Sequence, residues 1–228
     1  MAEPLPLRVE GLVIKARDGR SLLEVPRLDL PAGGALAVTG PSGAGKSSLL
    51  HALAGLLRPA QGRIVWGDTD LVSLSEPACA RFRRENVGLV FQDFLLFEEL
   101  PAFGNAAVAA SFAPARERAR IEAKAGEWLK RLGLGPRAEG SIQTYSGGER
   151  QRVAVARAMA HSPAVILADE PTASLDRASA DRLINDLVTI AAESRSTLIA
   201  VTHDASLARR LDGMLRLEDG RILDTVFD

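Results

Sequence analysis

"ALAVTGPSGAGKSSLLHALAGLL" (residues 35–57) decides the fold of this 228-residue chain. It begins with an apolar run typical of a buried strand, passes through a glycine-rich turn, and continues with leucines at helical spacing. The turn matches the pattern G-x-x-x-x-G-K-[ST], in which backbone N–H groups and a helix N-terminus bind phosphate. We therefore predict a phosphate-binding loop made of Gly40, Pro41, Ser42, Gly43, Ala44, Gly45, Lys46, Ser47 and Ser48. Lys46 is expected to reach the β- and γ-phosphates, and the Ser47 hydroxyl to ligate Mg²⁺.

Further apolar runs indicate the kind of sheet around this loop. Residues 164–169 and 197–202 are largely apolar, as is typical of parallel strands covered on both faces. Residues 7–38 are instead interpreted as short strands joined by turns, and Asp219-Gly220 lies between two alternating runs, as in a hairpin. We predict an α/β fold with a phosphate-loop core, a mainly parallel sheet and an antiparallel N-terminal part.

Strand patterns disappear between residues 93 and 162, where helical patterns replace them. We expect a single domain over residues 1–228, with a catalytic core (1–92 and 163–228) and an inserted all-helical subdomain (93–162).

Composition limits the partners of the chain. Lysine plus arginine (28) nearly balance aspartate plus glutamate (29), so no global charge favours nucleic acid, and we expect no such partner. The single cysteine excludes an internal disulfide and suits a reducing compartment. No apolar run approaches the ~18 residues of a membrane-spanning helix, and the start does not have the pattern of a signal peptide. A membrane role would therefore require another chain.

Two carboxylates, Asp169 and Glu170, come at the end of the apolar run that begins at residue 164. Asp169 stands at the strand end, where a phosphate-loop protein places its second Mg²⁺ ligand. Glu170 comes next, where a carboxylate can deprotonate a water that attacks the γ-phosphate. The alternative is a helix-capping pair, because Pro171 and Thr172 follow. The phosphate loop favours the catalytic interpretation.

The remaining motifs resemble those of the nucleotide-binding domain of ABC ATPases, in the order of that family and over nearly the whole chain. After the phosphate loop come "VFQDF" with Gln92, "YSGGERQ" (145–151), "VILADE", "SLD" (174–176) and "VTHD" with His203. Six motifs in one order are specific to this family. The resemblance implies that the chain binds ATP and Mg²⁺ and hydrolyses ATP.

In ABC ATPases two domains stack head to tail around two ATP molecules. The resemblance implies that Ser146, Gly147 and Gly148 meet the γ-phosphate bound by the other chain, so we expect a homodimer on ATP binding. Glycines allow close backbone approach, and the helix N-terminus favours the anion. Ser146 and Glu149 also spell a capping box, which can coexist with this role but does not by itself require the two glycines.

Three further roles are implied by the resemblance alone. Gln92 would contact Mg²⁺ or the attacking water and report the state of the substrate to the helical part. His203 would hydrogen-bond the γ-phosphate, although a lone histidine after a strand is more often structural. Asp176 would join the two chains near the opposite phosphate loop. The expected catalytic residues are thus Glu170, His203, Gln92 and Lys46, and the expected metal ligands are Ser47, Gln92 and Asp169.

The sequence departs from the family pattern in two places. The signature has Tyr145 where leucine is commoner and Glu149 where glutamine is commoner, and neither change removes the phosphate-facing residues. More importantly, no aromatic residue precedes Trp66, whereas the family usually stacks adenine on one. Arg17 could lie against the base, although a solvated turn is the simpler interpretation. We expect weak discrimination between nucleotide bases.

The stretch 86–108 looks like the subgroup that serves lipoprotein release, macrolide-type efflux and cell division. We expect a separate integral-membrane permease that holds the chain at the cytoplasmic face of the inner membrane. The apolar residues Phe94, Leu95, Leu96 and Phe97 either line a groove for a helix of that partner or pack the helical core. Alternatives are a mechanical, non-transport membrane complex, a soluble ABC ATPase, and a phosphate-loop nucleotide kinase. The kinase would have no use for "SGGE" or "VTHD".

Overall fold

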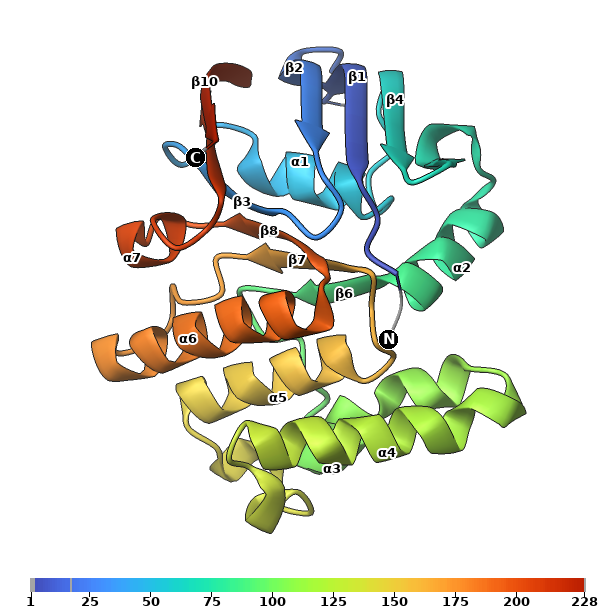
Figure 1. The fold of residues 1–228 in the computed structure, drawn as a ribbon, viewed down its shortest axis with the longest axis vertical. Coiled ribbons are helices and arrows are strands. Elements are labelled where there is room, and N and C mark those ends of the chain that lie inside the picture. The colour runs from blue at the N-terminus through green and yellow to red at the C-terminus, as the bar shows by residue number, and fades with distance from the viewer. Residues whose placement is uncertain (1–2, 17, 228) are drawn as a thin grey trace.

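The computed structural model describes residues 3–16 and 18–227, and within these residues it contains ten strands and seven α-helices (Figure 1). The strands are β1 (Leu7–Lys15), β2 (Ser21–Leu30), β3 (Ala35–Thr39), β4 (Gln61–Trp66), β5 (Thr69–Asp70), β6 (Val87–Val90), β7 (Val165–Asp169), β8 (Thr197–Val201), β9 (Gly213–Glu218) and β10 (Arg221–Phe227). The helices are α1 (Lys46–Leu53), α2 (Glu76–Asn86), α3 (Ala102–Ala106), α4 (Ala115–Arg131), α5 (Gly147–Met159), α6 (Arg177–Ser194) and α7 (Ala205–Ala208). Short 3-10 helices are η1 (Leu71–Ser73), η2 (Val108–Phe112), η3 (Gly135–Arg137) and η4 (Ile142–Thr144).

All ten strands belong to one mixed sheet in the order β5-β4-β1-β2-β10-β9-β3-β8-β7-β6. The strands β9, β3, β8, β7 and β6 are parallel to one another, whereas β5, β4, β1 and β2 form an antiparallel part. Strand β10 is antiparallel to β9 and parallel to β2. Figure 1 shows β1, β2 and β4 running across the direction of β7 and β8, with α1 between the two parts. The predicted fold class is confirmed, including the helical insertion between β6 and β7.

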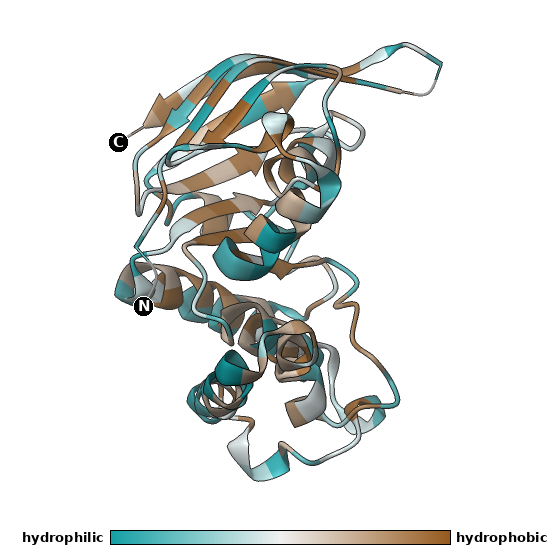
Figure 2. Ribbon diagram, turned by 90° about the vertical axis from the view of Figure 1, so that its right-hand side faces the viewer, coloured by the Kyte–Doolittle hydropathy of each residue, from teal (hydrophilic) through white to brown (hydrophobic). Residues whose placement is uncertain are grey.

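Buried side chains form two clusters, one on each face of the parallel strands. On β7, Val165 and Leu167 face the cluster that contains α1 and the antiparallel strands. Ile166 and Ala168 face the opposite cluster, which contains α5 and α6. This alternation follows from the period of two along a strand, and it explains why β7 is apolar throughout. In Figure 2 the hydrophobic colour is accordingly concentrated on the central strands.

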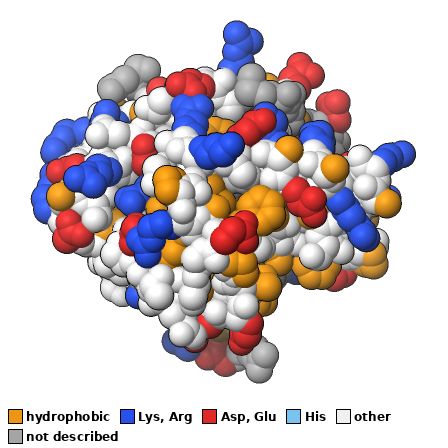
Figure 3. Space-filling model, turned by 90° about the horizontal axis from the view of Figure 1, so that it is seen from below, with side chains coloured by type: hydrophobic (Ala, Val, Ile, Leu, Met, Phe, Trp, Pro, Cys, Tyr) orange, Lys and Arg blue, Asp and Glu red, His pale blue; other side chains and the backbone are white. Residues whose placement is uncertain are grey.

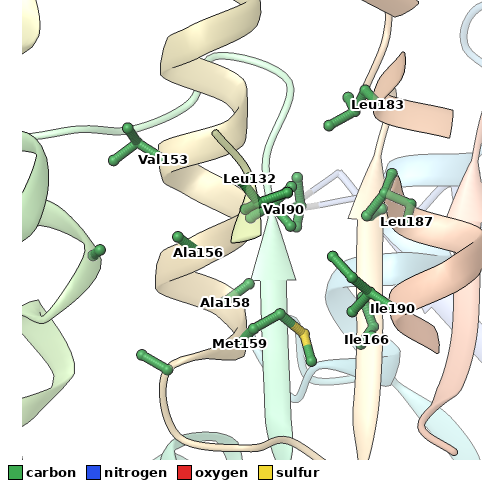
Figure 4. Close-up of a cluster of buried hydrophobic side chains, with 14 of the residues drawn as sticks. Val90, Leu132, Val153, Ala156, Ala158, Met159, Ile166, Leu183, Leu187 and Ile190 are labelled. Carbon is green, nitrogen blue, oxygen red and sulfur yellow. The ribbon is translucent and has the colours of Figure 1, made fainter. Parts of the chain in front are cut away.

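Helix α5 joins the helical subdomain to the sheet. Figure 4 shows Met159 of α5 beside Ile166 of β7 and Ile190 of α6, with Val90 of β6 nearby. These side chains are at most 2% exposed, so a movement of α5 would displace the side chains of β6 and α6 that pack against it. The helix therefore links the inserted subdomain to the strand that leads to Gln92.

Three local features differ from the sequence pattern or were not anticipated by it. Helix α1 ends at Leu53, although leucines at helical spacing continue to residue 57. Gly55 adopts a left-handed conformation (φ 65°) soon after the helix end. Strand β4 begins with the polar residues Gln-Gly-Arg, and α2 buries only Cys79 and Phe82. Neither segment has a strong hydrophobic period.

The hairpin predicted at Asp219-Gly220 is present, with φ of 46° and 75°.

Candidate active site

The loop between β3 and α1 wraps around the ammonium group of Lys46. Its Nζ donates to the carbonyl oxygens of Gly40 and Pro41, each at 2.9 Å, and the residue is only 7% exposed. Gly40 has a φ of 140°, and a β-carbon there would lie 2.0 Å from the carbonyl oxygen of Leu217, so only glycine fits. Gly45 precedes α1 without a side-chain cap. The first N–H groups of the helix can therefore bind an anion.

A pocket beside this loop collects residues from distant parts of the sequence. The predicted loop residues that line it are Ser42, Gly43, Gly45, Lys46, Ser47 and Ser48. They are joined there by Gln92, Glu170 and His203, which come from the ends of three other segments, and by Leu22. Ala44 is buried in the core instead, and does not line the pocket. The fold thus brings the candidate catalytic residues together around the phosphate loop.

Ser47 and Asp169 meet at the floor of this site. The Ser47 hydroxyl donates to Oδ1 of Asp169 at 3.2 Å, and Asp169 is 8% exposed at the end of β7. A hydroxyl and a carboxylate side by side are oxygen ligands of the kind that Mg²⁺ prefers. The two residues therefore fit the Mg²⁺ site expected from the sequence. Gln92, the third expected ligand, lines the same pocket and is exposed.

Glu170 is held directly against His203. The backbone N–H of His203 donates to Oε2 of Glu170 at 3.1 Å. Nε2 of His203 lies 2.9 Å from Oε1, although the angle between them does not make a directed hydrogen bond. Glu170 itself has a left-handed backbone (φ 43°), and its N–H donates to the Val201 carbonyl at 2.9 Å. The carboxylate is 11% exposed at the rim of the phosphate pocket, where a water-activating group is needed.

The segment Ser146–Gly148 starts helix α5 and lies outside this pocket. Both hydrogen bonds of the capping box are present. Glu149 N–H donates to the Ser146 hydroxyl at 3.3 Å, and Ser146 N–H donates to the Glu149 carboxylate at 2.8 Å. The latter bond is the main reason why the pKa of Glu149 is lowered. The capping box thus fixes the start of the helix and leaves both glycines to be explained.

The two glycines of this segment differ in what they contact. A β-carbon on Gly148 would lie 2.9 Å from Cβ and Oγ of Ser179 on α6, which is too close. A β-carbon on Gly147 would lie 3.6 Å from the Ser174 carbonyl oxygen, an ordinary contact. The interpretation that both glycines serve a phosphate is therefore incomplete, because packing within one chain already requires Gly148. Among the described residues, no contact within the chain requires glycine at position 147.

The two departures in the signature meet at Arg137. The Arg137 guanidinium lies 4.3 Å from the centre of the Tyr145 ring and 2.6 Å from the Glu149 carboxylate. Tyr145 is buried, and its hydroxyl donates to the Arg137 carbonyl. The unusual tyrosine and glutamate are therefore explained by one arginine that contacts both.

Asp176 caps helix α6. Its carboxylate accepts hydrogen bonds from the Ser179 hydroxyl at 2.6 Å and the Ser179 N–H at 3.0 Å. These bonds, the hydroxyl first, lower the pKa of Asp176. Within one chain the residue thus has a local structural role, which is compatible with the interchain contact expected from the sequence.

Leu22 is the pocket residue that the sequence analysis missed. It lies on β2, is 40% exposed, and lines the pocket together with the phosphate loop. The sequence signal that could have identified it is the pair Leu22-Leu23. Consecutive residues on a strand face opposite sides of the sheet, so the two leucines cannot both face the same core. Trp66 is fully buried, with Nε1 bonded to the Leu53 carbonyl, and does not reach this pocket. Arg17, the residue suggested to lie against the base, is outside the described residues.

The four apolar residues Phe94 to Phe97 were expected either to line a groove for a partner helix or to pack the helical core. Leu96 packs against the buried cluster of the helical part. Leu95 and Phe97 are 55% and 51% exposed. Figure 3, a view from the end of the molecule that carries the helical subdomain, shows hydrophobic side chains gathered among charged ones. Leu96 therefore packs the helical core, whereas the side chains of Leu95 and Phe97 lie on the surface.

The geometry of the site matches one type of chemistry. A loop that can bind phosphate groups, with a carboxylate held beside it at the ends of parallel strands, defines a phosphate-loop nucleoside triphosphatase. The model of the ABC transporter family matches residues 23–173, and the chain belongs to this family.

Relatives match almost the whole chain. A lipoprotein-releasing system ATP-binding protein LolD of Chromohalobacter salexigens is 38% identical over 95% of this chain and 92% of its own length. LolD 2 of Caulobacter vibrioides is 40% identical over 97% and 98%. A dimeric post-hydrolysis structure of the ATP-binding cassette MJ0796 with ADP and phosphate superposes with a TM-score of 0.86 at 29% identity, covering 97% of this chain and 98% of that chain. The chain is therefore an ABC-type, ATP-binding and ATP-hydrolysing subunit. Within the described part of the chain, no helix is long and apolar enough to cross a membrane.

Proposed function

We propose that this chain powers a separate integral-membrane permease, at the cytoplasmic face of the inner membrane, through ATP-driven closure of a homodimer. One observation carries the proposal: the phosphate pocket contains Gln92, Glu170 and His203 but not Ser146–Gly148. The site of one chain therefore lacks the signature segment. Relatives that are ATP-binding proteins of lipoprotein-releasing systems support a membrane complex, and the dimeric MJ0796 structures support pairing.

The first step of the proposed cycle is binding of Mg·ATP at the phosphate loop. Lys46 and the loop N–H groups hold the phosphates of ATP, with Ser47, Asp169 and Gln92 as the oxygen ligands for Mg²⁺. When bound, Mg²⁺ neutralises charge that develops on the phosphate oxygens.

The hydrolytic step belongs to two residues held in contact. Glu170 takes a proton from the attacking water. His203, whose backbone N–H holds the Glu170 carboxylate, donates from its imidazole towards the γ-phosphate.

The partner chain completes the site. In the closed pair, the N–H groups at the start of α5 face the γ-phosphate held by the other copy, and Asp176 lies near the opposite phosphate loop. Release of phosphate reopens the pair, and the loop after Gln92 transmits the movement to the permease.

A single pair of variants tests the shared site. Glu170→Gln is expected to bind ATP, turn over very slowly, and elute as a dimer with Mg·ATP but as a monomer with ADP in gel filtration. Adding Ser146→Arg to Glu170→Gln should abolish the dimer while ATP binding persists, because the arginine blocks the face that meets the partner. A monomer that hydrolyses ATP at the full rate would overturn the proposal. Purification of the chain from membranes with a multi-span protein tests the permease.

A further inference from the structure

Two consecutive residues after Gln92 adopt a left-handed backbone. Phe94 has a φ of 60° and Leu95 a φ of 48°. This region is unfavourable for residues that carry a β-carbon, and bulky residues occupy it only where the surroundings hold them there. The short stretch between Gln92 and the exposed Leu95 therefore depends on contacts from elsewhere in the fold.

Arg157 of α5 supplies those contacts. Its guanidinium donates to the carbonyl oxygen of Phe94 at 2.7 Å and also to that of Leu95. Arg157 makes no ion pair among the residues that the structure describes, and burial lowers its pKa. The half-buried guanidinium is thus bonded to neutral carbonyl oxygens and fixes the backbone at these two residues.

The far end of the same loop is held independently. Asn105 of α3 is fully buried, accepts from the Phe97 N–H at 2.7 Å, and donates to the carbonyl oxygens of Phe97 at 2.9 Å and Leu100 at 3.1 Å. The side-chain hydrogen bonds of Arg157 and Asn105 thus go to the backbone of residues 94–101. Side chains of α3 and α5 thus hold the backbone of the loop, in addition to the packing of Leu96 against the helical core.

The arginine and the signature segment lie on one rigid element. Helix α5 begins at Gly147 and carries Arg157 ten residues later, roughly 15 Å along the axis. Its start is the surface proposed to meet the nucleotide of the partner. Its later turns hold the loop that carries Gln92 of the chain's own pocket.

We propose that Arg157 is a positioning residue through which α5 ties Gln92 of one nucleotide site to the nucleotide held by the partner chain. This rests on the proposed dimer and on the proposed role of Gln92. When the partner's ATP draws the start of α5 into the interface, Arg157 carries the carbonyls of Phe94 and Leu95 with it. Gln92 then takes its place beside Glu170. The two sites of the pair are coupled by this route.

The test uses the full-length chain and measures ATP affinity, kcat and Tm. Arg157→Gln is expected to lower kcat about tenfold or more while the Kd for ATP changes less than about twofold, since the phosphate loop is untouched. Arg157→Lys, which keeps a donor but cannot reach both carbonyls, should be intermediate. The control is Arg131→Gln, which removes a surface arginine paired with Glu193. Its kcat should equal that of the wild type.

A double-mutant cycle separates positioning from general packing. If Arg157 acts through Gln92, Gln92→Ala/Arg157→Gln should be no slower than Gln92→Ala alone. Leu95→Gly should restore part of the kcat of Arg157→Gln, because glycine adopts φ near 48° without the β-carbon penalty. Should Arg157→Gln not fold, Arg157→Lys with and without Leu95→Gly gives the same comparison.

Several results would overturn the inference. One is a loss of kcat in the double variant equal to the product of the losses in the two single variants. Another is an unchanged kcat in Arg157→Gln. A third is a loss of kcat in Arg157→Gln that accompanies a lowered Tm and weakened ATP binding. If Gln92→Ala itself keeps the kcat of the wild type, the proposed role of Gln92 has failed. If Gln92→Ala is impaired and Arg157→Gln is not, only the present inference has failed.

Discussion

Nε2 of His203 lies 2.9 Å from Oε1 of Glu170, and the backbone N–H of the same histidine donates to Oε2 at 3.1 Å. The two residues are 33 positions apart and come from the ends of neighbouring parallel strands, β7 and β8. The backbone N–H of the histidine therefore holds the carboxylate in place.

Removing the imidazole should slow hydrolysis more than it weakens binding. We expect His203→Ala to lower kcat by about 10²–10³-fold, because the proposed imidazole donor to the γ-phosphate is lost, whereas the backbone N–H that holds Glu170 remains. The Kd for ATP, measured by titration calorimetry, should stay within about threefold, since the phosphate loop remains intact. A variant with equal losses in affinity and kcat would remove His203 from the hydrolytic step.

Replacing the loop lysine should act on binding. Lys46→Ala removes the proposed phosphate ligand and both hydrogen bonds to the loop carbonyls of Gly40 and Pro41. We expect the Kd for ATP to rise by at least about tenfold, the effect of roughly 1.4 kcal/mol. Equilibrium dialysis measures this directly. Unchanged affinity would show that the ammonium does not meet the phosphates.

The neighbouring glycines of the signature should respond in opposite ways. Gly148→Ala places a β-carbon 2.9 Å from Ser179 and should lower the free energy of unfolding by about 1–3 kcal/mol. Gly148→Ala/Ser179→Gly should recover part of this loss. Gly147→Ala should leave the stability of the monomer nearly unchanged but reduce ATPase activity, because its β-carbon would face the partner's nucleotide. Urea unfolding and steady-state kinetics distinguish the two effects.

A half-buried histidine should make the fold sensitive to acid. Burial lowers the pKa of His161 from 6.5 to about 4, with Arg120 adding to the shift and a hydrogen bond to the Val87 backbone opposing it. Between these values the unfolded chain binds a proton that the folded chain does not. Stability is thus fully present above about pH 6.5 and is lost as the pH falls towards 4, by up to about 3 kcal/mol.

Urea unfolding of a histidine variant from pH 7.5 to 4.5 measures this contribution. His161→Gln should flatten that part of the pH dependence. The matched control is His51→Gln on α1, which should keep the dependence of the wild type. An identical slope for His161→Gln and the wild type would contradict the prediction.

Base selectivity should be weak. No aromatic residue precedes Trp66, Trp66 is buried, and the pocket residue on β2 is the aliphatic Leu22. An aliphatic contact lacks the stacking that an aromatic ring gives. We expect GTP to be hydrolysed within about tenfold of the ATP rate at saturating nucleotide, a difference below roughly 1.4 kcal/mol. A slower GTP reaction would point to base contacts elsewhere.

The sequence by itself determined the elements with strong local patterns. The phosphate loop, the buried strands β3, β7 and β8, the amphipathic α5 and α6, and the hairpin at Asp219-Gly220 each have a period or a turn signal within a short window. The fold class followed from their order along the chain.

Only the tertiary structure decided which of these elements are neighbours. Strand β3 lies between β8 and β9, which are more than 150 residues further along the chain. This arrangement brings Ser47 against Asp169 and places Glu170 against His203.

The same limit applies to side chains whose role depends on a distant partner. The need for glycine at position 148 comes from Ser179 on another helix, and the left-handed turn at Phe94 from Arg157. Weakly patterned segments such as α2 and β4 form because neighbouring elements cover them. Local sequence specifies the dihedral angles of an element, but contacts between elements depend on the packing of the whole chain, which no short window contains.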